Sequence, residues 1–447
     1  MHYYIDPFGC VKNQVDAETM MLYLNNAGWS PAQDAADAGL IIVNSCGFIE
    51  SAKRESINAV LNWRRLYPEK KILLAGCLAQ RYAKELAESL PEADGFFGVD
   101  DISKIAETGV TTDFLVQKSS FPREALRPLL SLPGSAYIKI SEGCDNRCSY
   151  CAIPLIRGPQ RCRTVADILD ECCGFLARGI KELCIIGQDI GSYRSGSSGA
   201  EASVGLPELL NAIAGLSGDF WVRLLYIHPD HFPLPILDLM ERDSRFLPYF
   251  DIPFQHASQK ILGAMNRHGS AENYISLVET IRSRIPASVI RTTFLLGFPG
   301  ETEADFSALL DFQKQLRPDW LGCFTYSREE GTPAYTMKAR VPKKTAVQRR
   351  HEIENRQIPI TEKNVDRFIG QTLDVLLEEK IIPPEKPSEE TADEAGELWL
   401  GRLYCHAPEV DGAAVVIGGE ELKAGDMVPC KVIARRGFDC LVKGKIW

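Results

Sequence analysis

Three short apolar runs near the start of the chain each end in small residues followed by a cysteine. They read YYIDPFGC, LIIVNSC and KILLAGC, and a stretch with helical periodicity follows each of them. The cysteines, Cys10, Cys46 and Cys77, are 36 and 31 residues apart, which is close to the length of one βαβ unit. The pattern predicts a doubly wound parallel sheet over residues 1–110. Because the carboxyl ends of parallel strands meet at one edge of such a sheet, we expect the three cysteines to converge.

Chain length and composition limit the classes of protein to be considered. With 447 residues the chain exceeds one compact core, so two or three domains are expected. The formal net charge of −10 disfavours capture of nucleic acid by a broadly basic surface, although it leaves room for a local basic groove. The first residues do not form a signal peptide, and no apolar run reaches the ~20 residues that span a membrane. We therefore expect a cytoplasmic protein without a membrane partner.

Most of the 14 cysteines have an ordinary structural explanation. A disulfide framework is not expected, because the cytoplasm keeps thiols reduced and a long chain does not need such crosslinks. Cys172 and Cys173 lie in a helical pattern, and both are interpreted as core residues. Six more stand singly or carry only weak evidence for a role: Cys162, Cys184, Cys323, Cys405, Cys430 and Cys440. The three cysteines described above and a second set of three remain.

The second set lies in the segment GCDNRCSYCAIP, which follows the strand-like run SAYIKIS. Cys144, Cys148 and Cys151 form a C-x₃-C-x₂-C row in a loop that can bend around one metal centre. A closed zinc site needs a fourth ligand, and neither set offers a fourth cysteine or a regularly spaced histidine. An iron–sulfur cluster held at three corners fits both sets and leaves one iron open for a non-protein ligand. Each N-terminal cysteine taken alone is more readily explained as an inert buried thiol, and only the repetition favours shared ligation.

The row of cysteines, with Tyr150 before the last one, resembles the motif of the radical S-adenosylmethionine (SAM) family. The resemblance implies that the amino and carboxylate groups of SAM chelate the open iron, and that reductive cleavage of SAM gives a 5′-deoxyadenosyl radical. It also places Tyr150 against the bound nucleoside. A later segment, GFPGE, resembles the turn that packs against the adenine in this family, and it implies contacts from Gly297, Gly300 and Glu301.

Apolar strands alternate with helical patterns over residues 130–365. This alternation predicts a parallel partial barrel, the fold that the radical SAM resemblance also implies, with its chemistry at the carboxyl ends of the strands. Gln188 falls at such an end and is named as a candidate cofactor contact. His256 is interpreted as structural. For each polar residue at these ends, a ligand contact and a capping role are both left open: Gln188, Asp189, Arg223 and Gln255.

Residues 368–447 contain short strand-like pieces separated by glycine-containing turns, which predicts a small β-barrel. This part resembles the TRAM domain found in methylthiotransferases. The span 371–447 holds 15 Asp and Glu against 9 Lys and Arg, a net charge of −6. Because affinity for phosphates comes from Lys and Arg, this balance favours a basic protein over RNA as the partner, unless the acidic surface serves only solubility.

The whole chain resembles the radical SAM methylthiotransferases, and several segments resemble the RimO-type branch: FGCVKNQVDAE, VNSCGFIESAKRESI, WVRLLYIHP and HAPEVDG. The resemblance implies two 4Fe–4S clusters. One, on the second set of cysteines, cleaves SAM, and the other, on the first set, carries the sulfur to be transferred. The implied substrate is the β-carbon of an aspartate in protein S twelve of the small ribosomal subunit. A low-potential donor such as flavodoxin or ferredoxin is the implied reductant.

Two other functions are compatible with parts of the sequence. A tRNA adenosine methylthiotransferase would use the same clusters on a nucleic acid, although the acidic charge balance favours the protein substrate. An iron–sulfur electron carrier would need clusters closed by four protein ligands, and it would have no use for a barrel or for the GFPGE turn.

Overall fold

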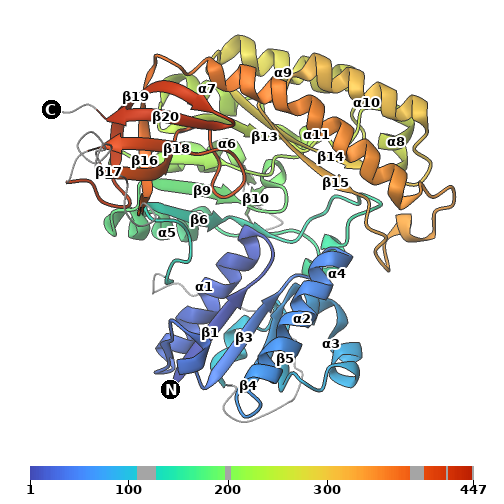
Figure 1. Ribbon diagram of the computed structural model, residues 1–447, viewed down its shortest axis with the longest axis vertical. Coiled ribbons are helices and arrows are strands. Elements are labelled where there is room, and N and C mark those ends of the chain that lie inside the picture. Colours follow the sequence, from blue (N-terminus) through green and yellow to red (C-terminus); the bar gives the residue numbers. More distant parts are fainter. Residues whose placement is uncertain (108–126, 197–202, 383–396, 419–420, 445–447) are drawn as a thin grey trace, which may run out of the picture. The chain divides into compact units, whose positions relative to one another are not determined.

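The computed structural model describes residues 1–107, 127–196, 203–382, 397–418 and 421–444 (Figure 1). These residues pack as two compact units. The first unit contains the described residues of 1–130 together with 139–163 and 327–337. The second contains 131–138 and the described residues of 164–326 and 338–447. The end of the predicted N-terminal domain (108–110) and residues 383–396 of the predicted last domain lie outside the described residues.

The first unit is built on a five-stranded parallel sheet in the order β2-β1-β3-β4-β5. Its strands are β1 (His2–Pro7), β2 (Ser30–Pro31), β3 (Leu40–Ser45), β4 (Lys71–Gly76) and β5 (Gly95–Phe97). Its helices are α1 (Val11–Asn26), α2 (Glu50–Leu66), α3 (Cys77–Ser89) and the short η2 (Ile102–Glu107). Residues 139–163 add α4 (Ile153–Arg157) and the paired strands β7 (Ser141–Glu142) and β8 (Arg161–Cys162).

Helices cover both faces of this sheet, which explains why its strands are continuous apolar runs and do not alternate with polar residues. On one face, α2 and α3 contribute Val60, Leu78 and Leu86 to a core with residues of β3 and β4. On the other face, Met20 of α1 and Ile105 of η2 pack against the same strands. The predicted doubly wound parallel sheet is confirmed.

Three neighbouring strands of this sheet end at the same level. Pro7 of β1 pairs with Asn44 of β3, and Ser45 of β3 pairs with Gly76 of β4. The connections also reverse here, because β1 leads through α1 to β2 on one side while β3 lies on its other side. In doubly wound sheets, ligands bind at such a switch point, outside the carboxyl ends of the strands.

The second unit contains an open six-stranded sheet in the order β15-β14-β13-β12-β9-β6. The strands are β6 (Ser135–Lys139, whose last residue belongs to the first unit), β9 (Glu182–Ile186), β12 (Trp221–Leu224), β13 (Phe246–Asp251), β14 (Val289–Leu296) and β15 (Trp320–Thr325). Strands β9 to β15 of this order pair in parallel. A small antiparallel pair, β10 (Arg194–Ser195) and β11 (Val204–Gly205), lies apart from this sheet. The partial barrel predicted from the alternation is confirmed.

The helices of this unit follow the strands in the order that the sequence predicts. They are α5 (Val165–Ala177), α6 (Leu206–Ala214), α7 (Ile236–Arg242), α8 (Gln259–Ala264), α9 (Ala271–Arg284), α10 (Glu303–Leu316) and α11 (Lys343–Asp366). Helices α9 and α10 lie side by side (Figure 1). Phe254 packs between their aromatic residues, with ring centroids 4.6 Å from Tyr274 and 5.8 Å from Phe312. Aromatic pairs at such distances stabilise the helix layer beyond the area that they bury.

The last part of the chain forms a closed barrel in the order β16-β17-β18-β20-β19. Its strands are β16 (Thr372–Ile381), β17 (Glu397–Arg402), β18 (Ala414–Gly418), β19 (Met427–Arg436) and β20 (Asp439–Gly444). Closure leaves no sheet edge open to pairing with another chain. The predicted small β-barrel is confirmed.

One sequence interpretation is wrong. Cys172 is buried in α5, but Cys173 is exposed. Successive residues of a helix are turned by about 100° from each other, so two neighbours rarely face the same narrow core. Among the described residues, no helix is both long and apolar enough to cross a bilayer.

A buried ion cluster joins the small barrel to the six-stranded sheet. Glu182 of β9 accepts hydrogen bonds from Arg223 of β12 at 2.7 Å and from Arg402 of β17 at 2.5 Å. Arg402 also pairs with Glu378 of β16. Burial alone would raise the pKa of Glu182, but the two guanidinium groups more than offset this and hold the pKa at about 2. The position of the small barrel within this unit therefore depends on buried charges that only their ion-pair partners stabilise, because water does not reach them.

Replacing Arg402 should destabilise the second unit strongly. Arg402→Met leaves Glu182 and Glu378 buried beside a single remaining guanidinium, so we expect the free energy of unfolding to fall by about 3–5 kcal/mol. Urea unfolding at pH 7 measures the loss. Arg356→Met removes only the exposed partner of Glu352 and should cost less than about 1 kcal/mol. Equal stabilities of wild type and Arg402→Met would contradict this interpretation.

The ion cluster around Glu182 also predicts that the free energy of unfolding depends on pH. The pKa of Glu182 is lower in the folded protein than its ordinary value of 4.5. The contribution of Glu182 to stability is therefore complete above pH 4.5 and is lost as the pH falls toward 2. The difference in unfolding free energy between wild type and Arg402→Met should narrow over that interval.

Candidate cluster and cofactor sites

The three N-terminal cysteines lie together at the switch point of the first sheet. Cys10 is the N-cap of α1, Cys46 follows β3 directly, and Cys77 opens α3 directly after β4. Their loops touch, because a Cβ placed on Gly9 would lie 3.2 Å from the Cβ of Cys46, and one on Gly47 would lie 2.6 Å from the carbonyl oxygen of Cys77. The glycine beside each of these cysteines lets the backbones approach that closely. The structure thus brings the first set of predicted ligands together.

Asn13 and Arg157 surround the deepest of these thiols. Asn13 Nδ2 donates to the carbonyl oxygen of Ser45 at 2.8 Å, which ties α1 to the end of β3. Its Oδ1 lies 3.1 Å from the Sγ of Cys77 and accepts from Nη2 of Arg157 at 2.6 Å. Arg157 Nη2 also lies 3.1 Å from the Sγ of Cys77 and can donate to it. A cation therefore faces this sulfur from the segment that follows the second cysteine set.

The electrostatics of the first set depend on burial and on Arg157. Burial raises the pKa of the Cys77 thiol to about 12, and Arg157 opposes the shift. Burial also raises the pKa of Cys46, against a backbone N–H from Phe48. Without a metal these thiols stay protonated at neutral pH. Metal binding must therefore displace their protons, as it does for thiolate ligands in general.

The donors of the first set fit an iron–sulfur cluster. Three thiols meet near the N-termini of α1 and α3, where the helix dipoles favour thiolates, and one guanidinium adds positive charge. Within the described ranges, no group of three or more His, Cys, Asp or Glu side chains is arranged to hold a metal ion. A single metal ion needs all its ligands around one point, whereas each cysteine that holds an iron–sulfur cluster binds a different iron, so the sulfurs lie farther apart. Soft thiolates are its usual ligands.

The second set lies on a loop that β7 and β8 close at its base. Ser141 pairs with Cys162 and Glu142 pairs with Arg161. The loop of residues 143–160 therefore begins and ends at the same strand pair. Gly143 has a φ of +78°, and a Cβ there would lie 2.2 Å from the carbonyl oxygen of Pro159. Only glycine can occupy this position. The amide of Cys144 donates to the carbonyl oxygen of Gly158 at 3.2 Å and completes the closure.

Cys148 is buried, whereas Cys144, Cys151 and Tyr150 are half-buried on the same loop. The amide of Cys151 donates to the carbonyl oxygen of Cys148 at 3.1 Å, which makes a tight turn between these two. The helix α4 follows at once, and its Ile156 packs in a small apolar cluster with Cys77. Both cysteine sets therefore belong to the first unit, and α4 connects them through packed side chains.

The GFPGE turn follows β14 in the second unit and is braced by its own glutamate. Gly297 has a φ of +76°, and a Cβ there would lie 2.4 Å from the Cβ of Ala346. Glu301 accepts from the amide of Gly297 at 2.7 Å and from Arg349 at 2.6 Å, and His256 Nε2 lies 3.7 Å from it. Burial would raise the pKa of Glu301, but these neighbours hold it below its ordinary value. The carboxylate thus fixes the turn, and Gly300 is held by the bond from its amide to Ala339 at 2.8 Å.

The polar residues at the barrel strand ends play mixed roles. Asp189 accepts from the amides of Gly191 and His228, at 3.0 and 3.1 Å, and lies 2.7 Å from His231 Nδ1, so it joins the loops after β9 and β12. Arg223, expected at a strand end, instead lies inside β12, where it is buried and donates to Glu182 of the ion cluster at 2.7 Å.

Gln188 and Gln255 follow β9 and β13. Gln188 is half-buried just after β9. Gln255 has a φ of +70° and bridges to β14 through two backbone hydrogen bonds. A non-glycine residue in this conformation is strained, and such strain is common at binding sites.

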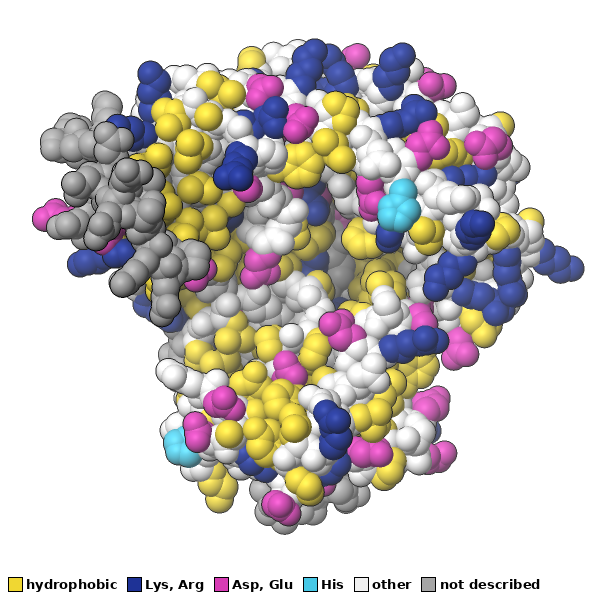
Figure 2. Space-filling view, in the orientation of Figure 1, with side chains coloured by type: hydrophobic (Ala, Val, Ile, Leu, Met, Phe, Trp, Pro, Cys, Tyr) yellow, Lys and Arg dark blue, Asp and Glu magenta, His cyan; other side chains and the backbone are white. Residues whose placement is uncertain are grey.

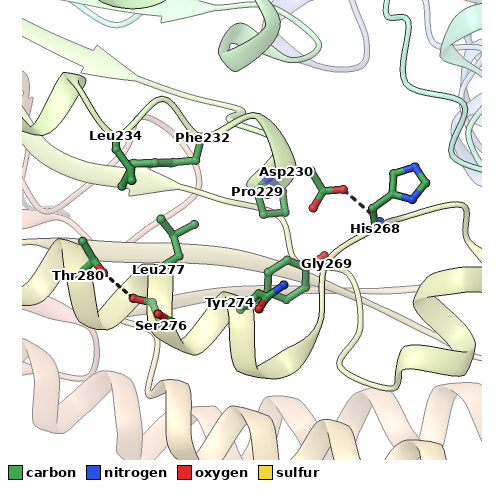
Figure 3. A pocket seen from close by; sticks show the side chains of 11 residues that line it. Pro229, Asp230, Phe232, Leu234, His268, Gly269, Tyr274, Ser276, Leu277 and Thr280 are labelled. Carbon is green, nitrogen blue, oxygen red and sulfur yellow. Dashed lines mark hydrogen bonds between the residues drawn. The ribbon is translucent and has the colours of Figure 1, made fainter.

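A hollow of about 450 Å³ lies elsewhere in the second unit (Figure 3). Phe232 and Leu234 line one side of it and Tyr274 and Leu277 of α9 line the other, while the carboxylate of Asp230 accepts from the amide of His268 at 3.1 Å. None of the residues that line it is a predicted site residue.

Three family models match the chain in order. The first is the uncharacterized protein family UPF0004 over residues 2–98, the second is the radical SAM superfamily over residues 138–312, and the third is the TRAM domain over residues 369–443. A curated relative, ribosomal protein uS12 methylthiotransferase RimO of Treponema denticola, is 47% identical over 97% of this chain and 99% of its own length. The chain belongs to the RimO family. Relatives of the same name from Carboxydothermus hydrogenoformans and Acetivibrio thermocellus are 40% and 38% identical over 96% and 97% of this chain, and the alignments cover 96% of each of them.

Solved structures share the fold of this RimO family member. The radical SAM methyltransferase TsrM of Kitasatospora setae, solved with tryptophan and a SAM analogue, aligns over 88% of this chain and 81% of its own. The TM-score is 0.54 and the sequence identity 14%. A second structure of TsrM, with cobalamin and a 4Fe–4S cluster, gives a TM-score of 0.53 at 15% identity over 74% of this chain and 73% of its own. These matches support the fold alone.

Sequence reasoning missed several residues around the first set. Asn13, Asp16, Glu142 and Arg157 surround Cys77 or bond to the groups that do. Asn13 and Asp16 lie one turn apart on α1, next to Cys10, which was the one available signal. The partner residues on α4 and β7 could not be inferred, because more than 120 positions separate them from Asn13 and Asp16.

Closure of the cysteine loop should depend on the bare backbone of Gly143. Gly143→Ala adds a Cβ that overlaps a carbonyl oxygen, so the loop cannot close at its base and should lose iron from Cys144, Cys148 and Cys151. Iron analysis after anaerobic reconstitution measures the loss. Gly28→Ala is the matched control, because Gly28 has a similar φ of +84° but open space around it. It should cost about 1–2 kcal/mol of stability and leave the iron content unchanged. Full iron content in Gly143→Ala would contradict this interpretation.

Proposed function

We propose that this chain transfers a methylthio group to the β-carbon of an aspartate in ribosomal protein uS12. The observation that carries the proposal is the identity of 36–47% with curated uS12 methylthiotransferases over nearly the whole chain. The radical SAM match and the three-cysteine loop support the same reaction class. It is an enzyme of the radical SAM type, and SAM and iron–sulfur clusters are its cofactors.

The two cysteine sets are proposed to hold one 4Fe–4S cluster each. Cys144, Cys148 and Cys151 would hold the cluster that binds SAM, and the first set would hold an auxiliary cluster. With SAM bound, the former supplies one-electron chemistry that activates a C–H bond, and the latter offers a site for the sulfur. Both sets leave one corner of a cluster without a protein ligand, because no fourth cysteine accompanies either set.

The chain itself supplies positioning and shelter for this chemistry. The β7–β8 closure fixes the loop of the second set, and the packing of Ile156 beside Cys77 keeps water away from the deepest thiol of the first set. Radical reactions need a closed site, because a stray hydrogen-atom donor quenches the radical and solvent opens side reactions.

Binding of the nucleoside is assigned to backbone and aromatic surfaces. We assign the adenine contact to the turn at Gly297 and Gly300, with Glu301 bracing that turn from behind. Tyr150 on the cysteine loop would contact the nucleoside. Gln188, after β9, is proposed as a further polar contact. The partners proposed for the enzyme are uS12 in the cytoplasm and a low-potential electron donor such as flavodoxin or ferredoxin.

One observation favours RNA contact as a second candidate. Four exposed basic residues precede or begin α11: Lys338, Arg340, Lys343 and Lys344. Figure 2 shows Lys and Arg side chains gathered at one edge of the second unit. A tRNA-modifying enzyme would use such a patch on phosphates, and binding would weaken steeply with salt. A gel shift with undermodified tRNA at two salt concentrations tests this candidate. We expect no salt-sensitive shift at physiological salt.

The two cysteine sets should separate functionally when mutated. Cys144→Ala, Cys148→Ala or Cys151→Ala should abolish formation of 5′-deoxyadenosine, because each removes a ligand of the SAM-binding cluster. Cys10→Ala, Cys46→Ala or Cys77→Ala should spare SAM cleavage but stop methylthio transfer to uS12. Chromatography of the nucleoside and mass spectrometry of uS12 measure the two outcomes. Cys172→Ala, which removes a buried thiol outside both sets, should leave both products in place.

The identity of the substrate needs its own readout. Mass spectrometry of small-subunit proteins from cells with and without this chain should show a methylthio adduct on uS12 only when the chain is present. An unmodified uS12 together with a modified tRNA would overturn the proposed substrate. A cluster spectrum that does not respond to added SAM would instead favour the electron carrier.

A further inference from the structure

Arg157 is the most deeply buried cation of the first unit that contacts a predicted cluster ligand. It ends α4, six residues after Cys151, and its side chain is 1% exposed. Its Nη2 lies 3.1 Å from the Sγ of Cys77, which belongs to the other cysteine set. A single side chain therefore connects the loop of one proposed cluster to a ligand of the other.

Two carboxylates hold the guanidinium in this position. Asp16 of α1 accepts from Nη2 at 2.8 Å, and Glu142 of β7 accepts from Nη1 at 2.7 Å. Lys139 donates to the same two carboxylates, at 2.5 and 2.6 Å. All four side chains are at least nine-tenths buried. With two cations and two carboxylates the network is electrically balanced without the cysteines.

The contact with Cys77 changes character when that residue ligates iron. As a thiol, Cys77 can donate to Asn13 Oδ1 at 3.1 Å. As a thiolate it has no proton to give, so the N–H of Arg157 becomes the donor at this sulfur. Nη2 carries two hydrogens and has three acceptors within reach, Asn13, Asp16 and Cys77. Because a ligating thiolate is charged and Asn13 Oδ1 is neutral, the sulfur competes for an N–H of Nη2 better than a neutral thiol would.

We propose that Arg157 is a positioning residue that sets the reduction potential of the auxiliary cluster. Hydrogen bonds to the sulfurs and nearby charge are two of the means by which proteins tune such clusters. A positively charged donor stabilises the reduced, more negative state and so raises the potential. This inference rests on the proposed ligation of a cluster by Cys10, Cys46 and Cys77. It adds that the loop with the SAM-binding cysteines also carries Arg157, the residue that tunes the auxiliary cluster.

The test isolates the auxiliary cluster in the full chain. Cys144→Ala/Cys148→Ala/Cys151→Ala removes the other cluster, and redox titration followed by electron paramagnetic resonance then reports only on the first set. Adding Arg157→Met should shift the midpoint potential to more negative values and change the g-values of the reduced cluster. Arg157→Lys keeps the charge but loses the planar fork, and it should shift the potential less.

Lys139→Met is the matched control, since it removes a cation from the same buried network while Arg157 stays beside Cys77. It should lower thermal stability as much as Arg157→Met but move the potential far less. If Arg157→Met does not keep its cluster, the midpoint potentials of Arg157→Lys and Lys139→Met are compared instead, and the inference requires the larger shift in Arg157→Lys. Midpoint potentials unchanged in the Arg157 variants, or shifted equally by Lys139→Met, would overturn the inference. A background variant that holds no iron at all would overturn the proposed first site and the inference with it, whereas a normal cluster with an unshifted potential would overturn the inference alone.

Discussion

The parallel register of β1, β3 and β4 is the constraint on which the proposed chemistry depends. Because Pro7 is level with Asn44 and Ser45 with Gly76, three cysteines that are far apart in sequence leave the sheet at one edge. A slip of one residue in any strand would turn its buried side chains to the other face, and both faces of this sheet carry packed helices. The burial of the sheet therefore enforces the position of the ligands, and the glycines next to the cysteines permit the close approach.

A second constraint is the balanced ion network around Arg157. It joins α1, β7 and α4 within the first unit, so the cysteine loop and the N-terminal sheet share one buried set of charges. Such networks cost desolvation and are weak evidence for stability. Their value here lies in geometry, because they hold a guanidinium beside the Cys77 thiol, which burial keeps protonated in the absence of a metal. In the second unit, the glutamate of the GFPGE turn and the cluster around Glu182 show the same use of buried charge to fix loops and strands.

The strands, the partial barrel, the small β-barrel and the convergence of the three N-terminal cysteines could be predicted because their signals are local. The role of the six cysteines as cluster ligands stays a prediction. Apolar runs, helical periodicity and a C-x₃-C-x₂-C row each lie within a short window. The partners of these residues could not be predicted, since Arg157 and Cys77 are 80 positions apart and Arg223 and Glu182 are 41 apart. Polar residues at strand ends were ambiguous for the same reason, and the structure shows Asp189 joining two loops. Cys173 was misjudged because the helical pattern was applied to two adjacent residues.

The most direct test of the central claim, that each cysteine set holds its own cluster, is the iron content with Mössbauer spectra of three anaerobically reconstituted proteins. These are the wild type, Cys10→Ala/Cys46→Ala/Cys77→Ala and Cys144→Ala/Cys148→Ala/Cys151→Ala. Each triple variant should keep half of the wild-type iron, with the spectrum of a 4Fe–4S cluster. Full iron content in either variant, complete loss in one of them, or zinc in place of iron would contradict the claim.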